Sequence, residues 1–210
     1  VERSRGLGDV YKRQVQPSPE KIEKLRRALE DYESGASGGH LIDADAEESK
    51  AAVRSRALGL LEQRARSRHE LRDRLIAAEF EPDVIEAVLD DLADVGLVND
   101  ASFAREWVRQ RHVRRGKSAR ALDMELKDKG VEAADRAAAL EQVTEDSEES
   151  IARQVAAKKA RTLKKVPADR HEREKFLRRI VGTLARRGYN QGLTMRVAIE
   201  ALDARIAELS

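Results

Sequence analysis

The sequence predicts an all-α protein, an elongated tandem array of three three-helix repeats with an extra helix at its N-terminal end. Of its 210 residues only 3% are aromatic and 38% are charged, a composition that favours helices with thin interfaces over a thick β-sandwich core. Apolar residues recur at helical spacing along most of the chain. A helix–turn–helix unit in residues 66–100 also recurs twice further on, as in helical repeat proteins.

The unit in residues 66–100 is bounded by helix start and stop signals. Ser67 stands three residues before Glu70, a spacing at which each side chain caps the other's backbone N–H. Pro82 suits the first turn of the next helix, and Gly96 suits its left-handed end. The two apolar stripes consist of Leu71, Leu75 and Ile76, and of Val84, Ile85, Val88, Leu89, Leu92 and Val95. Each unit therefore needs a packing partner for one face.

The later copies emerge when the corners between helices are aligned. Glu79-Phe80 corresponds to Gly130-Val131 and to Gly188-Tyr189. A shift of 51 residues (131 − 80) places Ser67, Leu71 and Leu75 over Ser118, Leu122 and Leu126. A shift of 109 residues (189 − 80) places Leu71, Leu75 and Val88 over Ile180, Leu184 and Val197. Units this small bury their stripes against one another, which predicts a repeat array.

The chain then divides into five expected segments. Val1–Gln14 has no helical stripe and looks like translated linker sequence, so it is left out of the fold prediction. The segments are a non-native or disordered leader (1–17), an N-terminal helix with a flexible acidic linker (18–48), repeat 1 (49–98), repeat 2 (99–145) and repeat 3 (146–210).

Each expected helix has its own signals. A helix from about Lys50 to Ala65 leads into repeat 1. Repeat 2 starts at the Asn99-Asp100 cap, with helices to Gly116, from Ser118 to about Lys129, and from about Glu132 to Val143; the last is held by Ala134, Ala137, Ala138 and Leu140 and should be the loosest. Repeat 3 has a long helix striped by Ile151, Val155, Lys159, Leu163 and Val166 and stopped by Pro167, then helices from Asp169 to Gly188 and from about Gln191 to Glu208.

The net charge of +2 conceals strong segregation of charge along the chain. Residues 81–100 contain seven acids and no base, whereas residues 101–120 contain seven bases and one acid. Residues 158–187 contain twelve bases and three acids. Any one run is explained by a solvated helix face, but alternating blocks also fit a polyanion or a charged protein groove.

Enzyme and metal signatures are missing from the sequence. There is no cysteine, no phosphate-binding loop motif and no HExxH, and the four histidines (His40, His69, His112 and His171) stand far apart. Asp90, Asp91 and Asp94 belong to the solvent-facing side of the predicted helix, opposite its apolar stripe. We therefore expect no catalytic residues, no metal and no cofactor. Because no signal peptide and no apolar run of about 18 residues occurs, we also expect a cytoplasmic protein without membrane contact.

Base readout by a helix–turn–helix is a rival hypothesis. The second helix of such a motif enters the major groove and meets dense phosphate charge. Here the helix from Pro82 to Val95 carries five acids and no base, so it would repel a duplex. Basic helices beside it could still touch phosphates without sequence preference.

The spacing of residues from about Lys50 to Leu202 resembles the bacterial RecX family. The resemblance is carried by Ala57-Leu58, Leu60-Leu61, Arg64 to Ser67, Glu70-Leu71, Leu75, Val88-Leu89, Leu92, Gly96-Leu97, Asp100 and Phe103-Ala104, and continues through Arg111, Gly116, Leu122, Glu125-Leu126 and Lys129 to Val131. Glu79 departs from the family, which usually has glycine at this corner. The last repeat is generic.

The resemblance implies a regulator of the RecA recombinase, active in homologous recombination, DNA repair and the SOS response. Such a protein is not an enzyme. It binds in the groove of the RecA–single-stranded-DNA filament, bridges protomers, and slows filament growth, ATP hydrolysis, strand exchange and co-protease activity. We expect a monomer, with weak direct DNA binding through its basic helices. A non-sequence-specific nucleic-acid-binding repeat protein is the alternative, and a protein scaffold without a DNA role is a third hypothesis.

The basic faces are the expected contact surface for RecA and DNA, although a single arginine or lysine is more often simply solvated. The expected residues are Arg64, Arg66, Arg68 and Arg72 in repeat 1, Arg109, Arg111, Arg114, Arg115 and Lys117 in repeat 2, and Lys158, Lys159, Arg161, Lys164 and Lys165 in repeat 3. Trp107 could stack on a base, but its place in the Phe103, Ala104 and Val108 stripe favours a core position.

Overall fold

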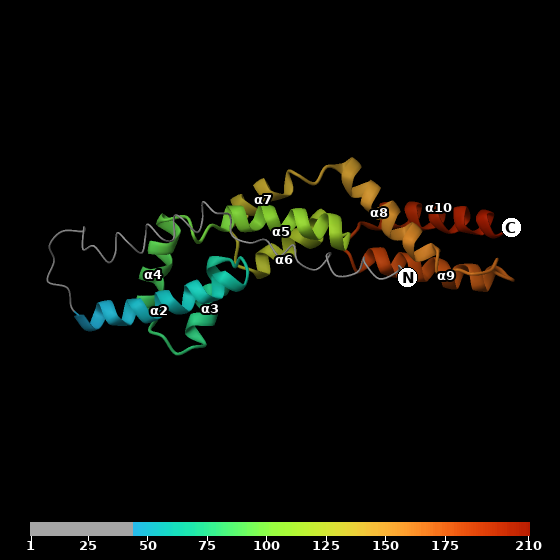
Figure 1. Cartoon of the computed structure of the whole chain (residues 1–210). Coiled ribbons are helices and arrows are strands. Elements are labelled where there is room, and N and C mark those ends of the chain that lie inside the picture. The colour runs from blue at the N-terminus through green and yellow to red at the C-terminus, as the bar shows by residue number, and fades with distance from the viewer. Residues whose placement is uncertain (1–43) are drawn as a thin grey trace, which may run out of the picture. The chain divides into compact units, whose positions relative to one another are not determined.

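The computed structural model describes residues 44–210, and every regular element in that range is an α-helix (Figure 1). The helices are α2 (Ala44–Gln63), α3 (Arg68–Ile76), α4 (Pro82–Asp94), α5 (Asp100–Arg115), α6 (Ala119–Asp128), α7 (Ala133–Leu140), α8 (Glu145–Ala160), α9 (Arg170–Ala185) and α10 (Gln191–Leu209). The predicted leader, N-terminal helix and most of the acidic linker lie outside the described residues. Within that range the all-α prediction is confirmed.

The described chain divides into two compact units. The first holds α2, most of α3, and α4 with the residues up to Val98; the second holds Ser67–Glu70 and α5–α10. One apolar cluster lies in the first unit, and the second unit contains two, one built by α5–α7 and one by α8–α10. Each cluster comes from three consecutive helices, as tandem three-helix packing requires.

The predicted stripes supply most of the core of the first unit. Leu71, Leu75, Ile85, Val88 and Leu89 are completely buried. Burying a leucine-sized side chain is worth roughly 1.5–3 kcal/mol, so these positions contribute most of the stability of this unit. The predicted N-terminal Pro82 of α4 is confirmed, and Gly96 follows with a left-handed φ of +74°.

The first unit differs from the prediction at the start of α2 and at two residues of the apolar stripes. α2 is already helical at Ala44, where the described residues begin, so it includes at least six residues before the predicted start at about Lys50. Ile76 and Val95 were placed in apolar stripes, but each is 48% exposed. Ile76 is the last residue of α3 and Val95 directly follows the last residue of α4, so both lie at helix ends.

The third helices of the second unit also correct the expected registers. In α7, Ala134, Ala137 and Ala138 are exposed, and the buried residue is Ala139. The helix ends at Leu140, because the chain turns there and Val143 N–H donates to the Leu140 carbonyl. Which of the helices is loosest stays a prediction.

The core-facing side of α8 is shifted by one residue from the predicted stripe. Ala152, Ala156 and Ala160 are buried, whereas Ile151, Val155 and Lys159 are only partly buried. α8 begins after the Thr144 cap and ends at Ala160, so Pro167 does not stop it, and Val166 is 41% exposed. Alanines on the packed side allow α9 and α10 to approach closely.

The three aligned corners share one backbone conformation. Glu79, Gly130 and Gly188 have φ values of +62°, +70° and +88°. At the first two corners the next residue's N–H reaches back five residues, from Phe80 to Leu75 and from Val131 to Leu126. Glu79 is the single non-glycine residue with positive φ among the described residues. The departure from glycine at this corner therefore leaves a strained residue.

We predict that Glu79→Gly stabilises the protein by about 1 kcal/mol, because a side chain in the left-handed region costs roughly 1–2 kcal/mol. Chemical denaturation followed by circular dichroism measures the gain. Glu79→Ala is the matched control: it removes the carboxylate but keeps the strain. Equal midpoints for the glycine and alanine variants would contradict the prediction.

The corner residue Tyr189 has a buried hydroxyl without a partner. Tyr189 is 6% exposed, and its Oη makes no hydrogen bond within the described chain. Burial raises the pKa of this hydroxyl, and the carboxylate of Glu148 raises it further.

Removing an unsatisfied buried polar group relieves a desolvation cost of about 1–3 kcal/mol. We therefore expect Tyr189→Phe to leave stability unchanged or to increase it by about 1 kcal/mol, measured by urea denaturation. Tyr189→Ala serves as the control that empties the site, and should destabilise by about 3 kcal/mol. A loss above about 1 kcal/mol in the phenylalanine variant would show that the hydroxyl has a partner.

Candidate polyanion-binding surface

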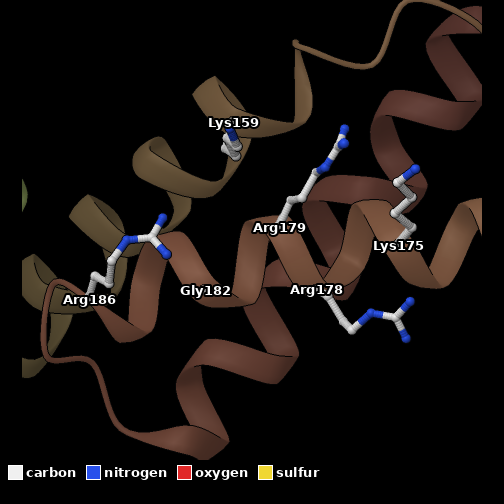
Figure 2. Close-up of a pocket in the computed structure, with 6 residues that line it drawn as sticks. All are labelled: Lys159, Lys175, Arg178, Arg179, Gly182 and Arg186. Carbon is white, nitrogen blue, oxygen red and sulfur yellow. The ribbon is translucent and has the colours of Figure 1, made fainter.

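Basic side chains of the second unit gather around two neighbouring clefts. The first cleft, here called the α8–α9 cleft, has a volume of about 450 Å³ and is lined by Lys159, Lys175, Arg178, Arg179, Gly182 and Arg186 (Figure 2). The second, here called the α5–α8 cleft, has a volume of about 520 Å³ and is lined by Val113, Arg114, Arg115, Gly116, Ile151, Gln154, Val155, Lys158, Lys159, Thr162, Thr183 and Arg187. Lys159 lines both, and neither lining contains an acidic residue.

The end of α5 is fixed against α8 by Gly116. Its φ of +61° forms the left-handed cap of α5, and its N–H donates to the carbonyls of the last turn. A Cβ at this position would lie 2.6 Å from Cγ2 of Val155 on α8, so only glycine allows this approach. The contact brings Arg114 and Arg115, in the last turn of α5, beside the basic end of α8.

α9 is tied to the same junction through its C-terminal end. Arg187 donates from Nε to the Arg115 carbonyl at 3.2 Å, and the Ser118 N–H donates to the Arg187 carbonyl at 2.9 Å. The buried ring of His112 lies across the turn, with Nδ1 2.8 Å from the Lys117 oxygen. These hydrogen bonds join the ends of α5 and α9, and the close packing at Gly116 adds α8 to the junction.

The five bases predicted in repeat 2 fall into two groups: two exposed arginines, and three bases that form ion pairs with glutamates. Arg114 and Arg115 are exposed, and no carboxylate of the described residues forms an ion pair with either. Arg109 donates to both oxygens of Glu106 at 2.7 and 2.8 Å, and these hydrogen bonds lower the pKa of the Glu106 carboxyl. Arg109 is thus already neutralised.

Glu125 is shared by the other two bases of this group. Its carboxylate lies 3.3 Å from Arg111 Nη1 and 3.1 Å from Lys117 Nζ, and it accepts a hydrogen bond from Trp107 Nε1. The Arg111 guanidinium also stacks 3.7 Å above the Trp107 ring. Trp107 is half-buried against the α5–α7 cluster, which confirms its predicted core position.

In repeat 3, the clefts include two of the five predicted residues. Lys158 and Lys159 line them, whereas Arg161, Lys164 and Lys165 are exposed but line neither. The structure adds Lys175, Arg178, Arg179, Arg186 and Arg187, which the prediction omitted. The count of twelve bases in residues 158–187 was the available signal, but it did not show which would meet in space.

Two of the bases predicted in repeat 1, Arg66 and Arg72, form contacts inside the first unit. Arg66 is only 7% exposed, and its Nε donates to the Leu60 carbonyl at 3.0 Å, so it satisfies the end of α2 rather than forming an exposed basic face. Arg72 is bound by both oxygens of Glu86, with Nη2 at 2.8 Å from Oε2.

Arg64 and Arg68 complete the repeat 1 set. Arg64 is exposed and donates to the Ala65 carbonyl, and the Arg68 backbone N–H donates to Asp100 at 2.8 Å. The Asp100 carboxylate therefore caps a backbone N–H at the start of α3.

The described residues show neither a metal-binding cluster nor a membrane-spanning helix. No cluster of three or more His, Cys, Asp or Glu side chains suited to a metal ion occurs there. None of the helices in residues 44–210 is long and apolar enough to span a membrane.

Comparisons with known proteins identify the chain's relatives. Residues 54–92 match the family description "RecX, first three-helix domain", and residues 99–140 match "RecX, second three-helix domain". The chain is 58% identical over 193 residues to the regulatory protein RecX of Corynebacterium efficiens, covering 90% of this chain and 91% of that protein. It is 38% identical over 179 residues to the regulatory protein RecX of Thermobifida fusca, covering 85% and 92%.

Solved structures show the same fold. A crystal structure of RecX from Lactobacillus salivarius matches with a TM-score of 0.60 at 22% identity, over 75% of this chain and 99% of that one. A crystal structure of another regulatory protein RecX matches with a TM-score of 0.63 at 20% identity, over 81% and 86%. Helical architecture, tandem domain matches and high identity over nearly the whole length agree, and the chain belongs to the RecX family of regulatory proteins.

Proposed function

We propose that this protein regulates the RecA recombinase by binding the RecA–single-stranded-DNA filament. Bound in the filament groove, it bridges protomers and lowers filament extension, ATP hydrolysis, strand exchange and co-protease activity. Membership of the RecX family supports the regulatory role. The observation that carries the proposal is the basic surface around the two clefts, whose lining includes no carboxylate.

Electrostatics explain why this surface suits a nucleoprotein filament. Cations without intramolecular partners attract phosphates over a Debye length of about 8 Å at physiological ionic strength. They also release counterions from nucleic acid on contact, which favours binding. Arg109, Arg111 and Lys117 contribute less, because each already forms an ion pair with Glu106 or Glu125. We therefore assign the filament contact to Arg114, Arg115 and Lys158 rather than to all the predicted bases.

The direct test measures ATP hydrolysis by RecA on single-stranded DNA with sub-stoichiometric amounts of this protein. The wild-type protein should lower the rate. The triple variant Arg114→Glu, Arg115→Glu, Lys158→Glu should require at least about tenfold more protein for the same inhibition, a loss of about 1.4 kcal/mol.

A matched control reverses three exposed bases of the same unit that line neither cleft, in the variant Arg105→Glu, Arg120→Glu, Lys127→Glu. It changes the net charge by the same amount and should inhibit like the wild type. Equal loss in both triple variants would refute the assigned surface. Undiminished ATP hydrolysis with wild-type protein would refute the proposed function.

The same basic surface also favours a second candidate, general nucleic-acid binding without sequence preference. This candidate predicts affinity for bare DNA that equals the affinity for RecA-coated DNA and falls steeply with salt. Base readout by α4 is disfavoured, because it carries Asp83, Glu86, Asp90, Asp91 and Asp94 and no base. Comparing affinities for bare and RecA-coated strands at one salt concentration separates the two candidates.

A further inference from the structure

One face of α9 carries a row of cations along the α8–α9 cleft. Lys175, Arg179, Gly182 and Arg186 follow one another at intervals of four, three and four residues, which places them on one side of the helix. Eleven residues of helix rise span about 16 Å. Lys159 on α8 lines the cleft from the opposite wall (Figure 2). The cleft is therefore bounded by a line of positive charge rather than by a single point.

None of these cations is neutralised within the described chain. No Asp or Glu carboxylate of residues 44–210 forms an ion pair with Lys159, Lys175, Arg179 or Arg186. Other bases of the same helix differ, since Arg170 pairs with Glu174 and Arg173 with Asp203. Like charges held close together repel one another, so this row is best satisfied by an external anion.

Gly182 in the middle of α9 has no structural requirement for glycine. Its φ is not in the left-handed region, and a Cβ there would meet only Arg186 Nη1, at 3.3 Å. Glycine in a helix interior is less favourable than other residues. What the missing side chain does provide is an open cleft floor, where a ligand can approach the helix between Arg179 and Arg186.

The two neighbouring arginines of α9 point in different directions. Figure 2 shows the Arg179 side chain on the side of α9 that faces α8, while the Arg178 guanidinium points away from it. The Arg179 guanidinium lies 5.0 Å from the Phe176 ring centroid, a cation–π contact that holds it in place. Because Arg178 also lines the cleft, the control of equal charge is Arg120 on α6, which is exposed and lines neither cleft.

We propose that the α8–α9 cleft binds a run of consecutive phosphate groups. Guanidinium and ammonium groups are the side chains that bind phosphate oxygens, and a row about 16 Å long suits an extended chain better than a single phosphate. The lining contains no aromatic residue on which a base could stack, so recognition is of the phosphates alone. This site needs no RecA, and it deepens the second candidate function, on which it rests, by naming the cleft and the run of phosphates that it would bind.

Two ligands present such a run, the backbone of single-stranded nucleic acid and inorganic polyphosphate. The experiment measures anisotropy of a fluorescein-labelled oligo(dT) with the full-length protein between about 50 and 300 mM salt, with unlabelled polyphosphate as competitor. For single strands the slope of log K against log salt is about −0.7 per neutralised phosphate, so four cations contribute about −2.8.

Three single variants test the geometry. Arg179→Gln should weaken binding and reduce the salt slope by about 0.7. Gly182→Leu changes no charge but fills the cleft floor, and should weaken binding about tenfold while raising the thermal unfolding midpoint. Arg120→Gln removes the same charge as Arg179→Gln from an exposed residue of α6 that lines neither cleft, and should bind as tightly as the wild type, with an unchanged slope.

Each outcome decides the proposal. Displacement of oligo(dT) by polyphosphate, with both sensitive to Arg179→Gln and Gly182→Leu, supports a site for phosphate runs from either source. Binding of only one anion with the same sensitivity supports the site and names its source. The proposal is overturned if neither anion binds at about 50 mM salt, if Arg120→Gln costs as much as Arg179→Gln, or if Gly182→Leu binds normally. Inhibition of RecA by the wild type would be unaffected by that failure.

Discussion

The contact between Gly116 and Val155 is the constraint on which the basic surface depends. At this point α5 ends in a left-handed residue, and α8 approaches so closely that no side chain fits between them. Arg187 and Ser118 add hydrogen bonds that bring the end of α9 to the same junction. Three segments that are far apart in sequence thus present their cations together. Without this junction each basic run would be a separate solvated helix face.

The second unit uses its charges in two distinct ways. Some cations form ion pairs within the fold: Arg111 and Lys117 pair with Glu125, and Arg136 pairs with Asp123 at 2.8 Å. Partly exposed pairs of this kind contribute at most about 1 kcal/mol each, so they guide packing more than they determine stability. The cations of the clefts are left without such partners among the described residues, and their repulsion is relieved when a polyanion binds. The repulsion between these cations slightly destabilises the folded protein, but the same cations remain available to bind a polyanion.

Local sequence signals predicted the backbone well. The caps at Ser67, Asn99, Ser118 and Asp169 each accept the backbone N–H of the third residue on, because capping depends only on near neighbours. The corners could also be aligned from sequence, and Glu79 adopts the glycine-like conformation that the alignment implies.

Registers and sites were harder to predict because they depend on distant residues. In α8 two adjacent apolar rows were available, and the sequence could not show that the smaller row, Ala152 to Ala160, would face α9 and α10. Arg111 was predicted to contact RecA or DNA, but it forms an ion pair with Glu125, which lies on another helix. The α8–α9 cleft arises only when Lys159 is packed opposite α9, which no local pattern records.

The most direct measurement of the central claim is lysine footprinting by pulsed acetylation and mass spectrometry, with and without the RecA–single-stranded-DNA filament. If the gathered cations form the contact surface, Lys158, Lys159 and Lys175 become several-fold less reactive in the complex, while the exposed Lys127 on α6 reacts as before. Protection of Lys127 with unchanged reactivity at the three cleft lysines would contradict the account.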